Sequence, residues 1–302
     1  MPNQIYPSYL AAAAPVKVIE LAEYARRYHL TGRFLGAVLF EGVTGTCLDN
    51  VAAGMLAMAV QSGKLQKGKP IIEASSGTFG AALALAGRRL GHPVYLVMPL
   101  TVDDERQHLL RCLGASIFTT DPLYGRDGCL KKARQLAQEN GGYFVNYFDN
   151  DDNPEYHRRV TGPALLAGCA GELDYIVAGV GSAGTVCGVA EYTKARTSRI
   201  KIIAVEPYEC SVLSGGFAGK HGIPGLGPGF IPANYNDAVI DGVMTATTTE
   251  ALKTAQELLQ LEGIPAAPAT GAVVCAARKL MQQPENAGKR IVALMGARQE
   301  LF

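Results

Sequence analysis

The chain has 302 residues, of which 48% are hydrophobic and 18% charged, so it can bury a large core as two domains or as one large α/β unit. Its 28 basic and 27 acidic residues give a net charge of +1, which argues against nucleic acid or an anionic membrane surface as a partner. Seven scattered cysteines without a CxxC or Cys/His cluster argue against disulfides and against a metal site.

The apolar stretch Tyr9–Val16 follows no basic region and is interrupted by Pro15. It therefore resembles neither a signal peptide nor a membrane span. We expect a cytoplasmic protein whose partner is a small molecule rather than a membrane.

Short apolar runs that end in glycine-rich turns alternate with longer segments of helical period. This pattern is typical of parallel strands joined by crossover helices and predicts an α/β fold. The predicted strands are 36–40, 70–74, 93–98, 116–119, 143–146, 175–178, 200–205 and 290–294. The predicted helices are 49–62, 80–90, 102–112, 126–140, 183–197, 249–261 and 271–282.

The Asn/Asp-rich stretch Tyr147–Pro154, within NYFDNDDNP, interrupts both the helical and the strand pattern. We expect it to separate an N-terminal α/β domain, residues 1–146, from a C-terminal one, residues 147–302. The start of the chain is expected to cross onto the other domain.

The glycine-rich segment Gly179–Thr185 follows a predicted strand and opens a predicted helix. Glycines there allow a tight turn, and the free amides of a helix N-terminus attract an anion. The phosphate cradle would comprise Gly181, Ser182, Ala183, Gly184 and Thr185. Two alternatives remain: a nicotinamide-binding fingerprint with Glu206 as its ribose-binding acid, and a turn that only packs helix against sheet.

A second polar loop, Ser75, Ser76, Gly77 and Thr78, follows the strand PIIEA and precedes a helix. Hydroxyls and amides at a helix N-terminus suit the carboxylate of an amino acid. The alternative is ordinary capping of the helix by serine or threonine.

Five ordered segments together resemble the cysteine synthase and cystathionine β-synthase family of fold-type II pyridoxal-phosphate enzymes, which is tryptophan synthase β-like. EASSGTFG resembles the family's E-P-T-S-G-N-T-G loop, and GVGSAGT resembles its G-T-G-T-G-G-T phosphate loop. NYFDNDDNPEYHRRVTGP, SGGFAGKHGIPGLGPGFIP and PATGAVVCAARKL are similar to three further blocks. The resemblance implies two three-layer domains with mainly parallel sheets, a pyridoxal phosphate cofactor and a homodimer.

The family's P-S-G-S-V-K-D-R motif, which carries the Schiff-base lysine, resembles residues 43–50 here and places Leu48 in the lysine column. Leucine cannot attach the cofactor or move a proton, so covalent attachment is not expected. Cys47 and Tyr147 are weak candidates for a substitute catalytic group. Lys64, Lys67 and Lys69 lie in a turn before a strand and are not well placed.

Three further positions depart from the family pattern. Thr78 replaces an asparagine expected beside the cofactor ring, and Gly296 replaces a serine expected at the ring nitrogen. Tyr147 replaces a glutamine expected at the substrate carboxylate, although some relatives that make diaminopropionate-type products resemble this chain there.

These features favour a catalytically degenerate cysteine synthase-like protein that binds an amino-acid or phosphate-bearing metabolite, or a partner. One alternative is an active β-replacement enzyme for O-acetylserine or O-phosphoserine that holds its cofactor non-covalently. Another is a nicotinamide oxidoreductase, which explains only one of the five segments.

Overall fold

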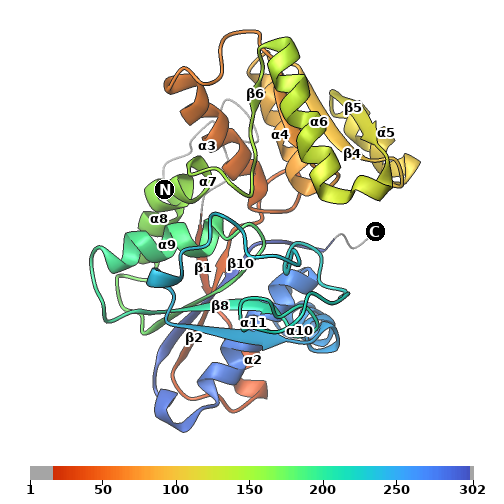
Figure 1. Ribbon diagram of the computed structural model, residues 1–302. Helices are drawn as coiled ribbons and strands as arrows, with labels where there is room; N and C mark the ends of the chain where they lie inside the picture. Colours follow the sequence, from red (N-terminus) through yellow and green to blue (C-terminus); the bar gives the residue numbers. More distant parts are fainter. Residues whose placement is uncertain (1–15, 300–302) are drawn as a thin grey trace. The chain divides into compact units, whose positions relative to one another are not determined.

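The computed structural model describes residues 16–299, so the apolar stretch before Val16 lies outside the described residues (Figure 1). The chain divides into two compact units. Unit 1 comprises residues 1–41, 45–47 and 153–302, and unit 2 comprises residues 42–44 and 48–152. The division thus follows Asp152, whereas the boundary expected from the sequence follows residue 146.

Unit 1 contains a six-stranded sheet with the order β1-β2-β10-β7-β8-β9. Only β1 is antiparallel to its neighbour, and the other pairs are parallel. The strands are β1 (Lys17–Glu20), β2 (Arg33–Val38), β7 (Tyr175–Gly179), β8 (Lys201–Pro207), β9 (Gly242–Ala246) and β10 (Arg290–Met295).

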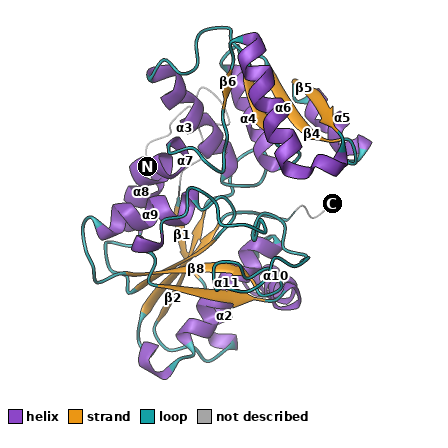
Figure 2. Ribbon diagram, viewed as in Figure 1, coloured by secondary structure: helices purple, strands orange, loops and turns teal. Residues whose placement is uncertain are grey.

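Helices cover both faces of this sheet, because alternate residues of its buried strands are apolar on both sides. One core joins Val177 and Ile291 to α2 (Ala22–Arg27), α10 (Thr248–Glu262) and α11 (Pro268–Met281). The other joins Ile176 and Val292 to α8 (Gly162–Gly168) and α9 (Gly184–Lys194). Unit 1 is therefore a three-layer α/β domain (Figure 2).

Unit 2 contains a parallel four-stranded sheet with the order β5-β4-β3-β6. Ile72 and Val97 pack against α6, whereas the opposite face contacts α4, where Gly87 lies against Ile71 and Val94. The strands are β3 (Ile71–Ala74), β4 (Val94–Pro99), β5 (Ala115–Thr120) and β6 (Tyr143–Phe144). The helices are α3 (Leu48–Gln61), α4 (Thr78–Arg89), α5 (Asp104–Cys112), η1 (Pro122–Tyr124) and α6 (Gly125–Asn140).

The structure corrects several boundaries. Elements β1, α2 and β9 were not expected, because they are short and half-exposed and carry a weak periodic pattern. The Asn/Asp-rich segment has no clear helical or strand pattern, but its end is helical. A continuous helical stretch begins there and consists of α7 (Asp152–Tyr156), the π-helical turn η2 (His157–Thr161) and α8. Short 3₁₀ turns are η3 (Asp237–Val239) and η4 (Pro284–Asn286). Strand β6 ends at Phe144 rather than at residue 146.

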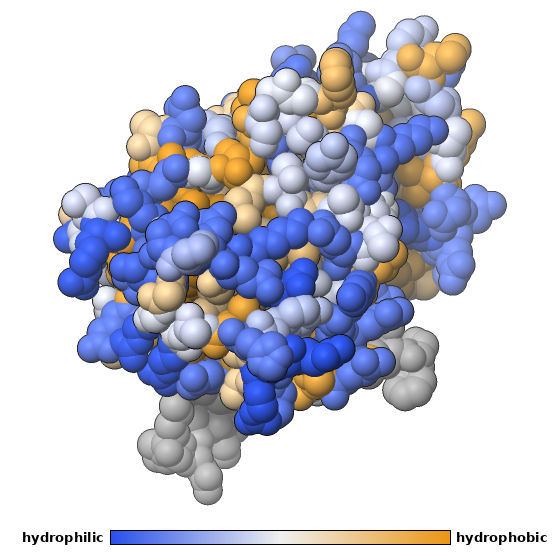
Figure 3. All heavy atoms as spheres, turned by 90° about the horizontal axis from the view of Figure 1, so that it is seen from below, coloured by the Kyte–Doolittle hydropathy of each residue, from blue (hydrophilic) through white to orange (hydrophobic). Residues whose placement is uncertain are grey.

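Within residues 16–299, no helix is both long and apolar enough to cross a bilayer. The same residues contain no group of three or more histidine, cysteine, aspartate or glutamate side chains that could hold a metal ion. All seven cysteines are free thiols. The face shown in Figure 3 is mostly hydrophilic with scattered apolar side chains, which is ordinary for a folded protein.

Candidate cofactor and substrate site

The glycine-rich loop of unit 1 connects β7 to α9. Ala183, the N-cap of α9, has a φ of 68° in the left-handed region, and this conformation turns the chain sharply into the helix. The first-turn amides of α9 have no partner within the helix, so they form a site suited to an anion. The predicted cradle Gly181–Thr185 therefore has the backbone geometry of a phosphate loop.

The glycines of this loop are required by close packing. A Cβ atom on Gly184 would overlap Asn153 Oδ1, and one on Gly181 would overlap the carbonyl oxygen of Gly225. Farther along α9, a Cβ atom on Gly188 would overlap the Pro154 carbonyl. The loop can therefore adopt this path only with glycine at these positions.

Buried polar side chains support both hydroxyls of the loop. Ser182 Oγ accepts a hydrogen bond from Asn153 Nδ2 at 2.9 Å, and Thr185 Oγ1 lies 3.1 Å from His157 Nε2. The other ring nitrogen of His157 lies 2.9 Å from Thr161 Oγ1. Burial lowers the pKa of His157 to about 3, so the imidazole is neutral and donates through one nitrogen while accepting through the other.

Sequence reasoning assigned no role to Asn153 or His157. Both are fully enclosed, with 0% and 2% exposure. Asn153 lies in the Asn/Asp-rich segment that the sequence predicts as a domain boundary, and His157 follows that segment within the block NYFDNDDNPEYHRRVTGP. The resemblance of that segment to a family block was the signal that could have identified them.

Glu206, the acid of the nicotinamide alternative, is 1% exposed. Its two oxygens accept hydrogen bonds from the amides of Leu213 and Ser214 and from the Ser214 hydroxyl, at 2.6 to 2.9 Å. Glu206 therefore anchors the 213–214 loop, and the nicotinamide alternative loses its ribose-binding acid.

Cys47 and Gly296 lie together in unit 1. The amide of Cys47 donates to the Gly296 carbonyl at 2.9 Å, next to the antiparallel bridge between Thr46 and Ala297. A Cβ atom on Gly296 would lie 3.7 Å from Cys47 Sγ, which is ordinary van der Waals contact. Sterically, the position could therefore hold the serine of the family pattern.

The predicted carboxylate loop in unit 2 connects β3 to α4. Ser75 Oγ accepts from the amides of Gly80 at 3.2 Å and Gly77 at 3.4 Å, so Ser75 caps the helix, as the alternative interpretation held. Ser76 is partly buried, and Gly77 and Thr78 are exposed at the N-terminus of α4. These three residues have the position from which a carboxylate could be bound.

Tyr147 packs against the same end of α4. Its ring stacks on Phe79 with centroids 3.8 Å apart and an interplanar angle of 22°, and its amide donates to Glu73 Oε2 at 3.3 Å. The structure thus joins Tyr147 to the Ser75–Thr78 loop within unit 2. Glu73 and Phe79 were not identified from the sequence as site residues.

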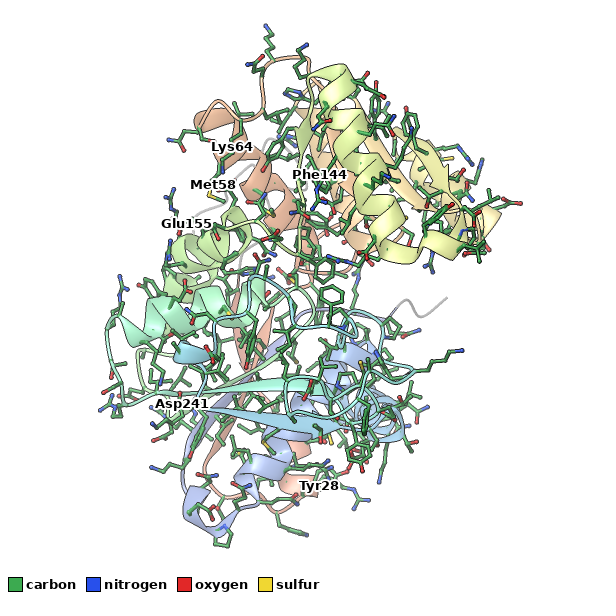
Figure 4. All side chains as sticks on the ribbon, viewed as in Figure 1. Tyr28, Met58, Lys64, Phe144, Glu155 and Asp241 are labelled. Atoms are coloured by element: carbon green, nitrogen blue, oxygen red, sulfur yellow. The ribbon has the colours of Figure 1, made fainter. Side chains whose placement is uncertain are left out.

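Leu48 is the first residue of α3 and is partly buried. The preceding segment is fixed to the helix, because Thr44 donates its amide and its hydroxyl to Asp49 Oδ2 at 3.0 and 2.6 Å. Lys64 lies beyond the other end of α3 (Figure 4), where it pairs with Asp152 at 3.1 Å. A helix of 14 residues is about 20 Å long, so Lys64 is remote from the Leu48 end.

Comparison with known proteins identifies relatives of this architecture. A family model described as "Pyridoxal-phosphate dependent enzyme" matches residues 40–296. Cysteine synthase 3 of Caenorhabditis elegans is 37% identical over 270 residues, which cover 88% of this chain and 80% of the relative.

Solved structures agree with this assignment. A cysteine synthase from Entamoeba histolytica has a TM-score of 0.92 and 33% identity, with 99% of this chain and 89% of that chain covered. A lysine-to-alanine variant of O-ureido-L-serine synthase, solved with O-ureido-L-serine bound, has a TM-score of 0.87 and 29% identity, covering 98% and 91%.

The chain therefore belongs to the pyridoxal-phosphate dependent enzyme family and, within it, to the cysteine synthases and their close homologues. Its mainly parallel α/β units have the architecture of fold-type II members.

Proposed function

We propose that this chain is a catalytically degenerate cysteine synthase-like protein that binds an amino-acid or phosphate-bearing metabolite without covalent attachment of pyridoxal phosphate. The observation that carries the proposal is Leu48 at the start of α3, in the column where the family motif has its lysine. A hydrocarbon side chain can neither bond covalently to the cofactor nor accept a proton.

The phosphate loop fits a phosphate group. Gly181 and Gly184 allow close backbone approach, the first-turn amides of α9 suit an anion, and the hydroxyls of Ser182 and Thr185 are held by buried partners. Gly296 of the same unit is proposed to lie at the cofactor ring. Pyridoxal phosphate, when bound, supplies an electron sink for carbanion chemistry.

Ligand binding without a lysine has a parallel among the relatives. The lysine-to-alanine variant of O-ureido-L-serine synthase holds O-ureido-L-serine, so that protein binds an amino acid after one lysine is lost. Here the partly buried Ser76 and the exposed residues Gly77 and Thr78, together with Tyr147, are proposed to bind the carboxylate of such a ligand.

A second candidate function is β-replacement on O-acetylserine or O-phosphoserine with a non-covalent cofactor. The intact phosphate loop and the cysteine synthases among the relatives favour it. Tyr147 or Cys47 would then have to move the α-proton. In either case we propose a homodimer, by analogy with the family.

The test compares the wild type with Leu48→Lys and with Leu48→Met, which retains an apolar side chain without an amine. Each protein is incubated with pyridoxal phosphate, reduced with borohydride, dialysed and analysed by intact mass, and sulfide incorporation from O-acetyl-L-serine is assayed. We expect an adduct only in Leu48→Lys, and no cysteine formation by the wild type.

A borohydride-stable adduct on the wild-type protein would overturn the proposal. Cysteine formation by wild type and Leu48→Met, with no adduct in either, would instead establish the second candidate function. Binding of O-acetyl-L-serine by the wild type without turnover would support the degenerate binding protein.

A further inference from the structure

Glu73 is a buried carboxyl group at the end of β3, with 2% exposure. Its Oε2 accepts a hydrogen bond from the Tyr147 amide at 3.3 Å, and the amides of Asn146 and Ala74 also donate to it. Strands β3 and β6 are neighbours, with Ile72 paired to Phe144. Glu73 therefore ties the chain that leaves β6 to the strand that leads into the Ser75–Thr78 loop.

The Tyr147 ring is held from a second direction. It stacks on Phe79, which is 5% exposed in the first turn of α4, directly after Thr78. Asn146, the preceding residue, has a φ of 50°, so the backbone turns sharply just before the tyrosine. Backbone and ring are thus fixed by different partners, one on each side of the loop.

Glu73 is also a titratable group that the proposed function does not use. Burial raises its pKa to about 8, against the lowering effect of the three amides and of Arg126 on α6. Arg126 in turn lies over the Phe148 ring at 5.6 Å. Tyr143 on β6, whose own pKa burial raises to about 12, stays neutral around pH 8.

We propose that Glu73 and Phe79 are positioning residues that hold Tyr147 beside the Ser75–Thr78 loop, where Tyr147 forms an aromatic wall of the amino-acid site and sets its specificity. The inference rests on the proposed function only in placing the ligand at this loop. Ionisation of Glu73 strengthens the hydrogen bonds that its oxygens accept and adds a negative charge behind the loop. The position and the electrostatic environment of Tyr147 therefore depend on pH.

The first test needs no ligand. In full-length protein labelled with ¹³C in its tyrosine rings, the Tyr147 resonance is assigned by its loss in Tyr147→Phe. We expect this resonance to move with an apparent pKa near 8 in the wild type and to be independent of pH in Glu73→Gln. Below pH 7, Glu73→Gln should resemble the wild type, because the amide oxygen still accepts from Tyr147, whereas Glu73→Ala should not.

Phe79→Leu should shift the same resonance, and Phe118→Leu should leave it unchanged. Phe118 is a matched control because it forms a different aromatic pair in the same unit, with Tyr95 at 5.2 Å. An unmoved Tyr147 resonance in Phe79→Leu, or an unaltered titration in Glu73→Gln, would overturn the proposed positioning.

The second test measures the Kd of O-acetyl-L-serine by calorimetry at pH 7. Phe79→Leu should weaken binding about threefold to tenfold, as loss of an aromatic pair implies, and Phe118→Leu should not. If the resonances behave as expected and O-acetyl-L-serine does not bind, the positioning stands and the proposed ligand class is wrong. If O-acetyl-L-serine binds equally well to Phe79→Leu and to the wild type, Tyr147 is not a specificity determinant.

Discussion

Two regions of the molecule differ in how closely they follow the family motifs. One is the glycine loop of unit 1, and the other is the region of unit 2 that contains Leu48 and Tyr147. In the loop 179–185, Gly181, Ser182, Gly184 and Thr185 keep the family's glycines and hydroxyls, and both hydroxyls contact buried polar side chains. In unit 2, the proposed function places Leu48 where the family motif has its lysine, and Phe79 and Tyr147 form a stacked aromatic pair. If the proposed function holds, anion binding persists on this scaffold without covalent attachment of the cofactor.

The regions also differ in their buried titratable groups. His157 in unit 1 has a strongly lowered pKa and stays neutral, whereas Glu73 in unit 2 has a raised pKa and holds its proton. Both shifts have burial as their largest cause, because burial disfavours the charged form of either group. The stability of the two regions should therefore respond to pH in opposite directions.

The largest expected effect comes from filling the tight loop. Gly184→Ala should lower the free energy of unfolding by about 1 to 3 kcal/mol and abolish binding of pyridoxal phosphate, because the added methyl overlaps Asn153 Oδ1. Gly77→Ala in unit 2 is the control for stability alone, since nothing lies within 4 Å of its Cβ position. Urea unfolding measures the stability of the two variants, and calorimetry measures pyridoxal phosphate binding by Gly184→Ala. An equal loss of stability in both variants would contradict the contrast between the regions.

The pH response of the two buried groups is an effect of comparable size. His157 has a pKa of about 3 against an ordinary 6.5, so the unfolded chain binds the proton between these values and stability rises with pH there. Glu73 has a pKa of about 8 against an ordinary 4.5, so the folded chain binds the proton and stability falls as pH rises through that window. For each group, the free energy of unfolding changes by at most about 1.4 kcal/mol per pH unit.

Urea unfolding of wild type, His157→Gln and Glu73→Gln from pH 4 to 9 checks these slopes. The stability difference between wild type and His157→Gln should grow from about pH 4 to 6.5 and then level off. The difference for Glu73→Gln should shrink from about pH 4.5 to 8. Parallel curves for all three proteins would refute both assignments.

A smaller effect is expected at the segment before Leu48. Thr44→Val removes the hydroxyl that donates to Asp49 Oδ2 at 2.6 Å and should cost about 1 kcal/mol of stability. Thr44→Ser, which keeps the hydroxyl, should cost less. The free energy of unfolding distinguishes them, and a Thr44→Ser variant as unstable as Thr44→Val would show that the methyl group, not the hydrogen bond, matters.

The smallest effect concerns Lys64. Its ion pair with Asp152 joins a half-exposed lysine side chain to a largely buried carboxylate, so Lys64→Ala should change stability by less than about 1 kcal/mol. It should leave pyridoxal phosphate affinity unaltered, because Lys64 lies beyond the far end of α3 from Leu48. A loss of cofactor binding would show that Lys64 takes part in holding the cofactor.

The sequence by itself determined the parallel α/β class and most of the long elements, because their apolar periods are strong. It also determined the position of the glycine loop, since the glycines and the strand before them are contiguous in the chain. Leu48 could likewise be read directly, because its motif lies within eight consecutive residues.

Tertiary structure alone decided which side chains support these loops. Asn153 and His157 reach Ser182 and Thr185 from a segment about 30 positions earlier, and Glu73 reaches Tyr147 across two neighbouring strands. Such contacts join residues far apart in the chain, so they produce no periodic pattern in the local sequence from which they could be predicted. The pKa shifts also needed the fold, because they depend on burial that no single segment can supply.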